Sequence, residues 1–405
     1  LQSLGRFDEA LSAFDKAIAL DPNYAQAYNN HGTALFDLER FDDAISSYDR
    51  AIALWSDNPE ALTNRGLALM ELARAREAIT NFDAALACEP NYAEAIFNRG
   101  TARLMIGEFE SGWRDYEARK TKPEPVANRS MPYRLWLGDE PIAGTTILVH
   151  HEQGLGDTIQ FCRYLALLEQ AGANVIFAPQ SSLKKLMAGL TVCLGVRARI
   201  VDLNETHHRV DFHCPLMSLP MALATRLDSI PHRVPYLSAE SARIARWRPR
   251  IGTEGFRIGI CWQGSATKID RGRSFSVSEF HGLAKIPGVR LISLHKGSGE
   301  AQLANLPNGM TVETLDADFD SGPDAFLDTA AVMECCDLVI TSDTAIAHLA
   351  GALARPTWVA LRQIPDWRWL LNRTDSPWYP SLRLYRQSTA GDWADVFQRI
   401  ERDVV

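Results

Sequence analysis

Three short motifs place side chains that can transfer protons or bind anions beside glycines or at an expected helix start. The first is EQGLGD at residues 152–157. Gly154 and Gly156 let the backbone turn tightly and come close to a ligand. Asp157 has two interpretations. It can take a proton from an acceptor hydroxyl, with Glu152 as a reserve, or it can be the N-cap of the helix expected to follow.

The second motif is SDTAIAHLAGAL at residues 342–353. Asp343, Thr344 and Ala345 open an expected helix, and His348 lies one turn inside it. Free N–H groups at a helix N-terminus bind anions, so this segment predicts contacts with the diphosphate or ribose of a nucleotide. The alternative is ordinary helix capping by Ser342 or Asp343, with His348 as a buried structural residue.

The third motif, residues 261–275, concentrates positive charge in one segment. Its candidates for binding a nucleotide diphosphate are Gln263, Ser265, Lys268, Arg271 and Arg273. Positive charge suits a leaving diphosphate, because negative charge develops on that group during transfer. A solvated loop is the alternative, and three cations in an acidic protein argue against it.

A fourth stretch, DWRWLLNRTDSPWYP at residues 366–380, is rich in tryptophan. Aromatic faces can stack on a sugar or a base. Aromatic residues at this density also pack the corners of domains, and we favour that interpretation.

Composition narrows the class of protein. The formal net charge of −8 argues against a nucleic-acid-binding protein, and no apolar run is long enough to span a bilayer. The seven scattered cysteines form no CxxC pair, and no signal peptide is visible, which indicates reduced thiols in a cytoplasmic protein. The nearest match to a metal-binding carboxylate pair, DADFD at 316–320, falls in an expected loop. We therefore expect neither a metal nor a cofactor.

The first third of the chain repeats every 34 residues, which is the tetratricopeptide period. Small residues that permit close helix crossings recur together with aromatic residues that fill the space between hairpins. The series are Ala10, Ala44 and Ala78; Phe14, Tyr48 and Phe82; and Gly32, Gly66 and Gly100. They predict a leading helix over about 7–20 and helical hairpins over about 25–54, 59–88 and 93–120.

Asn30, Asn64 and Asn98 follow the same period on the first helix of each hairpin. An asparagine amide both donates and accepts hydrogen bonds. A ladder of them can therefore bind an extended peptide through its backbone. Packing between helices is the alternative.

After a proline-rich stretch, strand candidates alternate with helical stretches, as in parallel-sheet α/β domains. Two Rossmann-like lobes in series suggest the GT-B fold, in which a ligand lies beyond the carboxyl ends of the strands. The expected strands are 146–150, 175–178 and 210–214 in one lobe, and 257–262, 289–295, 337–342 and 357–362 in the other. The expected domains are repeats (1–120), a linker (121–140), an N-terminal lobe (141–250) and a nucleotide-sugar-binding C-terminal lobe that ends in a helix (251–405).

From Trp113 to Trp393 the chain resembles a bacterial group of repeat-containing glycosyltransferase-like proteins. The matching stretches include GWRDYEARK, EQGLGDTIQFCRYL, DTAAVMECCDLVITSDTAIAHLAGAL and SPWYP. The second and third motifs are also similar to the ADP-heptose heptosyltransferases of glycosyltransferase family 9. Those are inverting, metal-independent enzymes of GT-B fold.

The resemblance to family 9 implies a role for individual residues. Asp157 corresponds to the base, and Lys268 to a phosphate ligand. Asp343, Thr344 and His348 correspond to the nucleotide-binding signature. In that signature a glycine stands where this chain has an alanine at position 345.

The layout of repeats followed by a transferase resembles that of eukaryotic O-linked N-acetylglucosamine transferase. It implies an enzyme that moves a sugar from a nucleotide-diphosphate donor to a hydroxyl, on a protein or peptide acceptor held by the repeats. Two alternatives stay open. One is a repeat adaptor whose transferase domain binds a nucleotide sugar without turnover, and the other is a lipopolysaccharide or glycan transferase.

Overall fold

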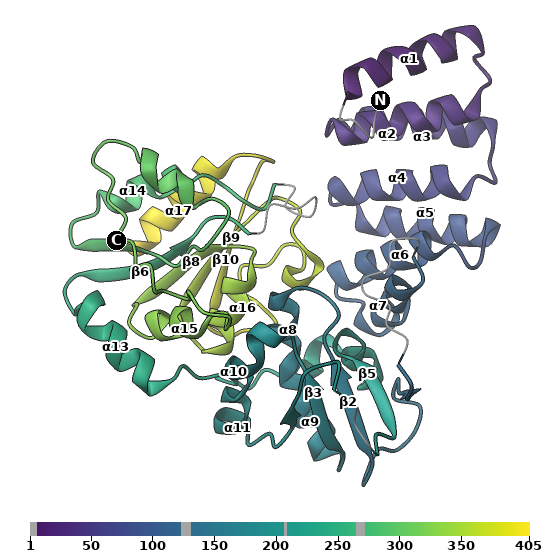
Figure 1. The fold of residues 1–405 in the computed structure, drawn as a ribbon. Coiled ribbons are helices and arrows are strands. Elements are labelled where there is room, and N and C mark those ends of the chain that lie inside the picture. Colours follow the sequence, from purple (N-terminus) through teal and green to yellow (C-terminus); the bar gives the residue numbers. More distant parts are fainter. Residues whose placement is uncertain (1–5, 123–130, 206–208, 265–271) are drawn as a thin grey trace. The chain divides into compact units, whose positions relative to one another are not determined.

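The computed structural model describes residues 6–122, 131–205, 209–264 and 272–405, in two compact units (Figure 1). The first unit contains the repeats together with a short segment, Asp366–Leu371. The second unit contains the rest of the α/β part. Within the described ranges, no helix has the length and apolar character needed to span a membrane.

The repeat unit confirms the predicted leading helix and hairpins. Its helices are α1 (Phe7–Leu20), α2 (Ala25–Asp37), α3 (Phe41–Leu54), α4 (Pro59–Glu71), α5 (Ala75–Cys88), α6 (Ala93–Met105) and α7 (Phe109–Tyr116), followed by the short 3₁₀ helix η2 (Glu117–Lys120). The glycines are needed because the aromatic rings of the partner helices fill the space beside them. A Cβ atom on Gly66 would lie 2.5 Å from the ring of Phe82, and one on Gly32 would lie 2.6 Å from the ring of Tyr48.

A second series with the same period links neighbouring helices through polar side chains. Arg65 binds Asp49 at 2.6 Å and Asn81 at 3.1 Å. One repeat later, Arg99 binds Asp83 and Asp115 at 2.6 and 2.7 Å. Each arginine therefore joins its own hairpin to the preceding one.

The tryptophan-rich segment supplies part of the packing of the repeat unit. Its short helix η10 (Trp367–Trp369) lies against the last hairpin. The ring of Trp367 contacts those of Trp113 and Tyr116 edge-on, with centroid distances of 5.1 and 5.8 Å. This is the packing role that we favour for these aromatic residues from the sequence.

The α/β unit contains two five-stranded sheets in which all the paired strands are parallel, as expected for two Rossmann-like lobes. The first sheet has the order β1-β5-β2-β3-β4. Its strands are β1 (Arg134–Leu135), β2 (Thr146–His150), β3 (Asn174–Ala178), β4 (Arg199–Ile200) and β5 (Phe212–Pro215). Its helices are α8 (Leu155–Phe161), α9 (Leu165–Gln170), α10 (Lys184–Met187), α11 (Gly189–Leu194) and α12 (Leu219–Ala222).

The second sheet has the order β10-β9-β8-β6-β7. Its strands are β6 (Phe256–Cys261), β7 (Val289–Ser293), β8 (Leu338–Ser342), β9 (Thr357–Leu361) and β10 (Leu382–Arg386). The helices of this part are α13 (Ser241–Ile251), α14 (His281–Ala284), α15 (Leu327–Met333), α16 (Ala345–Ala352) and α17 (Trp393–Val404). Buried aliphatic and aromatic side chains from β6, β7, β8 and α17 form its core. The sequence predictions missed three strands, β1, β4 and β10.

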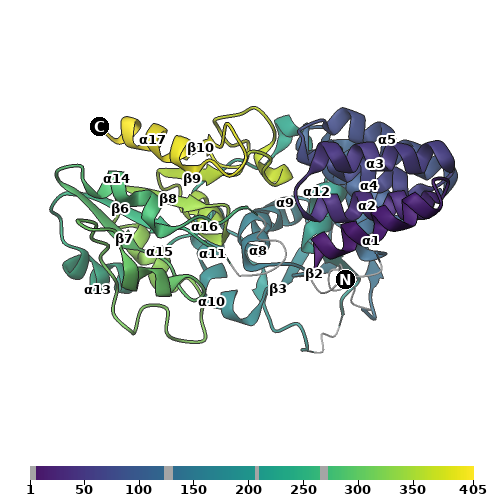
Figure 2. The ribbon, with the colours of Figure 1, turned by 90° about the horizontal axis from the view of Figure 1, so that it is seen from above.

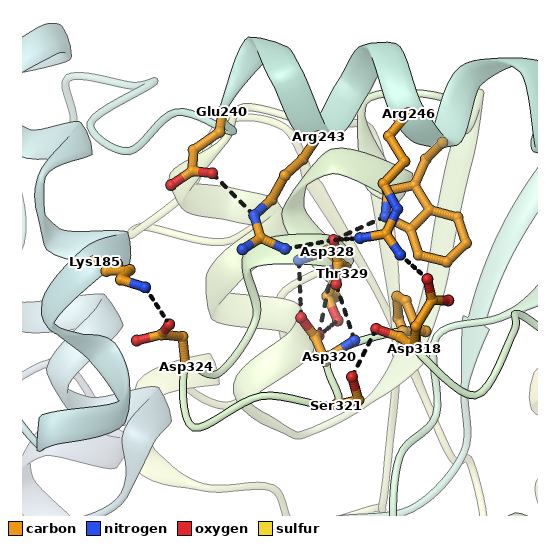
Figure 3. Close-up of polar contacts among 12 residues, drawn as sticks. Lys185, Glu240, Arg243, Arg246, Asp318, Asp320, Ser321, Asp324, Asp328 and Thr329 are labelled. Atoms are coloured by element: carbon orange, nitrogen blue, oxygen red, sulfur yellow. Dashed lines mark hydrogen bonds and ion pairs between the residues drawn. The ribbon is translucent and has the colours of Figure 1, made fainter.

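The acidic loop that contains DADFD is held by arginines of α13 (Figure 3). Arg246 pairs with Asp318, and Arg243 donates to Asp328 at 2.7 Å. The part of the loop that leads to α15 contacts the first lobe, where Nζ of Lys185 donates to Oδ2 of Asp324 at 2.7 Å. These carboxylates therefore form ion pairs with arginine and lysine side chains. In the part of the chain that the structure describes, no group of three or more His, Cys, Asp or Glu side chains is arranged to hold a metal.

Candidate active site

The first two sequence motifs, one from each lobe, meet in the structure. Helices α8 and α16, which carry them, lie side by side in both ribbon views (Figure 1 and Figure 2). A Cβ atom on Gly156 would lie 3.1 Å from Cδ2 of His348 and 3.3 Å from Cα of Ala345. The glycine therefore lets the start of α8 approach the start of α16 more closely than another residue would.

Asp157 is the third residue of α8 and not its N-cap, so the N-cap interpretation is wrong in position. The N-cap is Gly154, whose backbone N–H donates to Oδ2 of Asp157 at 2.8 Å. The Asp157 carboxylate thus stabilises the first turn of α8 by a hydrogen bond back to the N-cap residue. The role of Asp157 as a base stays a prediction.

The glycine turn before α8 is also fixed by Gln180, which follows β3. Its amide donates to the carbonyl of Gln153 at 2.8 Å, and its carbonyl oxygen accepts from the hydroxyl of Thr158 at 2.7 Å. Glu152, the reserve base, is buried, and Oε2 accepts the N–H of Met217 at 3.3 Å. Sequence reasoning missed Gln180, although its position two residues after a strand is a usable signal.

Helix α16 follows β8, and its N-cap is Thr344. The Thr344 hydroxyl accepts the N–H of Ile346 at 3.3 Å and lies 3.2 Å from the hydroxyl of Thr341. The alternative of capping by Ser342 or Asp343 is therefore wrong, because the N-cap is Thr344. Asp343 is buried immediately before the cap.

His348 is buried one turn into α16, and its Nδ1 lies 3.0 Å from the hydroxyl of Tyr379. The ring of Tyr379 lies on α16 at Gly351, where a Cβ atom would overlap it. Neither Tyr379 nor Gly351 stood out in the sequence. The only signal was the aromatic density of the SPWYP stretch.

The described part of the third motif lies in the same region. Ser265, Lys268 and Arg271 lie outside the described residues. A Cβ atom on Gly264 would be 3.4 Å from the Thr344 side chain, so β6 ends beside the start of α16. Gln263 lies nearby, and its Oε1 accepts from Gln302 at 3.3 Å. Arg273 is half-buried where the described chain resumes.

Two further arginines, Arg362 and Arg386, lie at the carboxyl ends of neighbouring strands in the second sheet. Arg386 is the last residue of β10 and pairs in register with Leu361 at the end of β9, directly before Arg362. Burial lowers the pKa of Arg386 to about 10. A Cβ atom on Gly272, within the third motif, would lie 3.9 Å from Cδ of Arg362. The carboxyl ends of these strands therefore add two arginines that the motifs did not include, at the edge where ligands of parallel sheets bind.

The three asparagines of the repeats lie in different surroundings. Asn64 donates to Asn29 of the preceding hairpin at 3.1 Å, and Asn29 in turn donates to Glu60 at 3.0 Å. Asn30 accepts from Gln26 at 3.3 Å, and Asn98 is half-buried. The packing alternative therefore accounts for Asn64, and peptide binding by the series stays a prediction.

Comparison with known proteins matches both parts of the chain. The tetratricopeptide repeat family matches residues 1–59 and 63–118, and glycosyltransferase family 9 (heptosyltransferase) matches residues 298–361, which include β8, α16 and β9. Protein FlbA of Caulobacter vibrioides is 26% identical over 324 residues, a match that covers 73% of this chain and 52% of FlbA. The chain thus spans about half the length of that relative.

Among solved structures, MamA is similar to the chain with 27% identity and a TM-score of 0.28, covering 29% of this chain and 68% of MamA. YrrB, described as a TPR protein with an unusual peptide-binding site, has 24% identity and a TM-score of 0.27, covering 29% of this chain and 61% of YrrB. Together with the repeats and paired sheets, the family matches identify the two parts. The chain carries tetratricopeptide repeats in its N-terminal region and a glycosyltransferase family 9 domain in its C-terminal part.

Proposed function

We propose that the α/β unit is an inverting glycosyltransferase that moves a sugar from a nucleotide-diphosphate donor to a hydroxyl without a metal ion. The observation that carries the proposal is the approach of the EQGLGD turn to the start of α16. A turn that carries a carboxylate and a helix N-terminus suited to phosphate thereby lie together at strand ends. The match to family 9 over residues 298–361 supports the reaction class.

The second lobe is the proposed donor side. The N-terminus of α16, with Asp343, Thr344 and Ala345, offers backbone N–H groups to a diphosphate. His348 adds a ring nitrogen in the next turn. The cationic and polar ligands proposed from the third motif are Gln263, Ser265, Lys268 and Arg273, and the strand ends contribute Arg362 and Arg386. Fixed positive charge of this kind stabilises a departing diphosphate in place of a metal.

The first lobe is the proposed acceptor side. An inverting transfer needs a base on the face of the sugar opposite the leaving group, and Asp157 is the proposed base with Glu152 in reserve. Gly154 and Gly156 keep the backbone close to both substrates. We retain the domain division 1–120, 121–140, 141–250 and 251–405 as part of this proposal.

The repeats are proposed to hold a protein acceptor, with Asn30, Asn64 and Asn98 among the contacts. Charge supports a basic acceptor segment. Residues 1–120 contain 20 acidic and 12 basic side chains, and residues 121–405 contain 30 of each. The repeats therefore carry the whole net charge of −8, and such a field favours Lys- and Arg-rich partners.

A thermal-shift screen of nucleoside diphosphates and nucleotide sugars tests the donor side. A ligand that binds only the folded state raises the melting temperature, and the shift grows with ligand concentration. The best donor is then offered to basic and acidic acceptor peptides and to glycans. Donor binding with no transfer to any acceptor would favour the silent adaptor, and transfer to glycans alone would favour the glycan transferase.

A further inference from the structure

Strands β2 and β3 are neighbours in the first sheet, and the segments that follow them stay hydrogen-bonded beyond the strands (Figure 1). The last pair in register is His150 with Ala178, and the N–H of His151 then donates to the carbonyl of Ala178 at 3.0 Å. Two residues further along, the side chain of Gln180 continues this pairing in place of the backbone. It binds the glycine turn that leads from β2 into α8 and carries Asp157.

Gln180 contacts the chain on both sides of Asp157. Its Nε2 donates to the carbonyl of Gln153 at 2.8 Å and to that of Gly154 at 3.3 Å, before the aspartate. Its Oε1 accepts from the hydroxyl of Thr158 at 2.7 Å, directly after the aspartate. Thr158 is buried in α8. One side chain therefore joins the segment before the helix to the helix itself.

The partners of the Gln180 amide determine its orientation. Carbonyl oxygens only accept hydrogen bonds, so the two backbone carbonyls must face the NH₂ group. The hydroxyl of Thr158 then donates to Oε1, which has no hydrogen of its own. In the reversed orientation, the amide oxygen would face both carbonyl oxygens and neither bond could form. The contacts therefore allow a single assignment of donors and acceptors.

The turn depends on such a brace because it contains two glycines. Gly154 and Gly156 have no Cβ atom, and the backbone at glycines samples more conformations than at other residues. Gly154 is held at both of its polar groups. Its N–H donates to Oδ2 of Asp157 at 2.8 Å, and its carbonyl accepts from Gln180. The position of the Asp157 carboxylate is therefore coupled to the residue that follows β3.

We propose that Gln180 is a positioning residue for the transfer reaction, because it fixes the glycine turn so that the Asp157 carboxylate stays in place for the acceptor hydroxyl. Gln180 acts through the backbone of the turn and through Thr158. The catalytic half of this inference rests on the proposed function, in which Asp157 is the base. The bracing half rests on the hydrogen bonds of Gln180 alone.

Hydrogen exchange of the full chain tests the bracing half. Gln180→Met keeps the length of the side chain and removes its three hydrogen bonds to the turn and α8. The backbone amides of residues 154–158 should then exchange about 10-fold faster, the factor that corresponds to the loss of one or two ordinary hydrogen bonds.

Asn174→Ala is the matched control for hydrogen exchange. Asn174 begins β3, and its amide donates to the carbonyl of Thr145 at 3.4 Å, at the opposite end of the same pair of strands. Its loss should leave exchange at residues 154–158 as in the wild type. Unchanged exchange of these amides in Gln180→Met, or equally fast exchange in Asn174→Ala, overturns the proposal.

Kinetics with the donor found by the screen test the catalytic half. Gln180→Met should lower kcat about 10-fold to 100-fold, the loss expected when a catalytic group is slightly misplaced. Donor affinity should stay at the wild-type value, and Asn174→Ala should keep the wild-type kcat. A wild-type kcat in Gln180→Met overturns this half, whether or not donor affinity falls.

Thr158 gives a second test of the same contact. Thr158→Val removes the hydroxyl at similar volume and should lower kcat, whereas Thr158→Ser keeps the hydroxyl and should keep kcat. The double variant Gln180→Met/Thr158→Val should be no slower than Gln180→Met, because both changes break one unit. Additive losses would overturn the proposal. If the wild type transfers sugar from no donor, the proposed function and the catalytic half both fail, and hydrogen exchange still decides the bracing half.

Discussion

Replacing Asp157 separates catalysis from helix capping. The carboxylate accepts a hydrogen bond from the backbone N–H of Gly154 at 2.8 Å and lies in the first turn of α8. Asp157→Asn keeps an acceptor for that bond and removes the negative charge, which is worth about 0.3–1 kcal/mol at a helix N-terminus. Asp157→Ala also removes the hydrogen bond, at a further cost of about 0.5–1.5 kcal/mol. The free energy of unfolding should therefore fall in the order wild type, Asn, Ala.

Turnover should follow a different order. If Asp157 is the base, both variants lose about 10²–10⁴-fold in kcat, because neither side chain can accept the proton. Donor affinity should stay near that of the wild type, since the proposed donor ligands lie in the other lobe. The assays are chemical denaturation for stability, calorimetry for donor binding and initial rates with the donor found by the screen.

An aspartate that caps another helix serves as the control for the effect of Asp157→Asn on stability and kcat. Asp392 is the N-cap of α17 and accepts the N–H of Asp395 at 3.1 Å. Asp392→Asn should lower stability slightly and leave kcat unchanged. Retention of most of the wild-type kcat in Asp157→Asn would refute the assignment of Asp157 as the base. Glu152→Gln would then be the next variant to measure.

Three further perturbations test other parts of the structure. Gly66→Ala forces a Cβ atom against Phe82 and should destabilise the repeats by about 1–3 kcal/mol. Gly322→Ala is the control and should be nearly neutral, because a Cβ atom there meets open space. Thermal unfolding followed by circular dichroism compares the two variants. Lys185→Glu replaces the ion pair with Asp324 by two facing carboxylates and should lower the free energy of unfolding by about 1 kcal/mol, because Lys185 is largely exposed. The double variant Lys185→Glu/Asp324→Lys should restore the loss, and failure to do so would contradict a charge-dependent contact. EDTA should leave the transfer rate unchanged, and activity that EDTA abolishes and Mg²⁺ restores would contradict the metal-free mechanism.

The sequence alone was sufficient for the repeats, because their signal is periodic and local. A residue recurring every 34 positions marks the same crossing in each hairpin, and the structure places Gly66 against Phe82 as that period requires. The longer strands other than β10 were also readable, because a buried parallel strand is a continuous apolar run. Two of the five residues of β10 are arginines, which interrupt such a run. Strands β1 and β4 were not, since two residues give no pattern and their pairing partners are distant in the sequence.

The candidate site was also predictable from the sequence only in part. The residues of EQGLGD and TAIAH could be found because strand, turn and helix follow one another along the chain. Their approach to each other, at Gly156 and His348, depends on how the two sheets pack, and no local signal encodes it.

Only the tertiary structure brings Arg163, Tyr236 and Tyr379 together, with the Arg163 guanidinium over both aromatic rings. These residues lie up to 216 positions apart in the sequence, and each is an ordinary core residue when considered by itself. The Tyr379 hydroxyl lies 3.0 Å from Nδ1 of His348 and 3.4 Å from the hydroxyl of Tyr236, which itself donates to the carbonyl of Ile159. Such contacts are properties of a packed three-dimensional network, because they join residues that no local sequence pattern brings together.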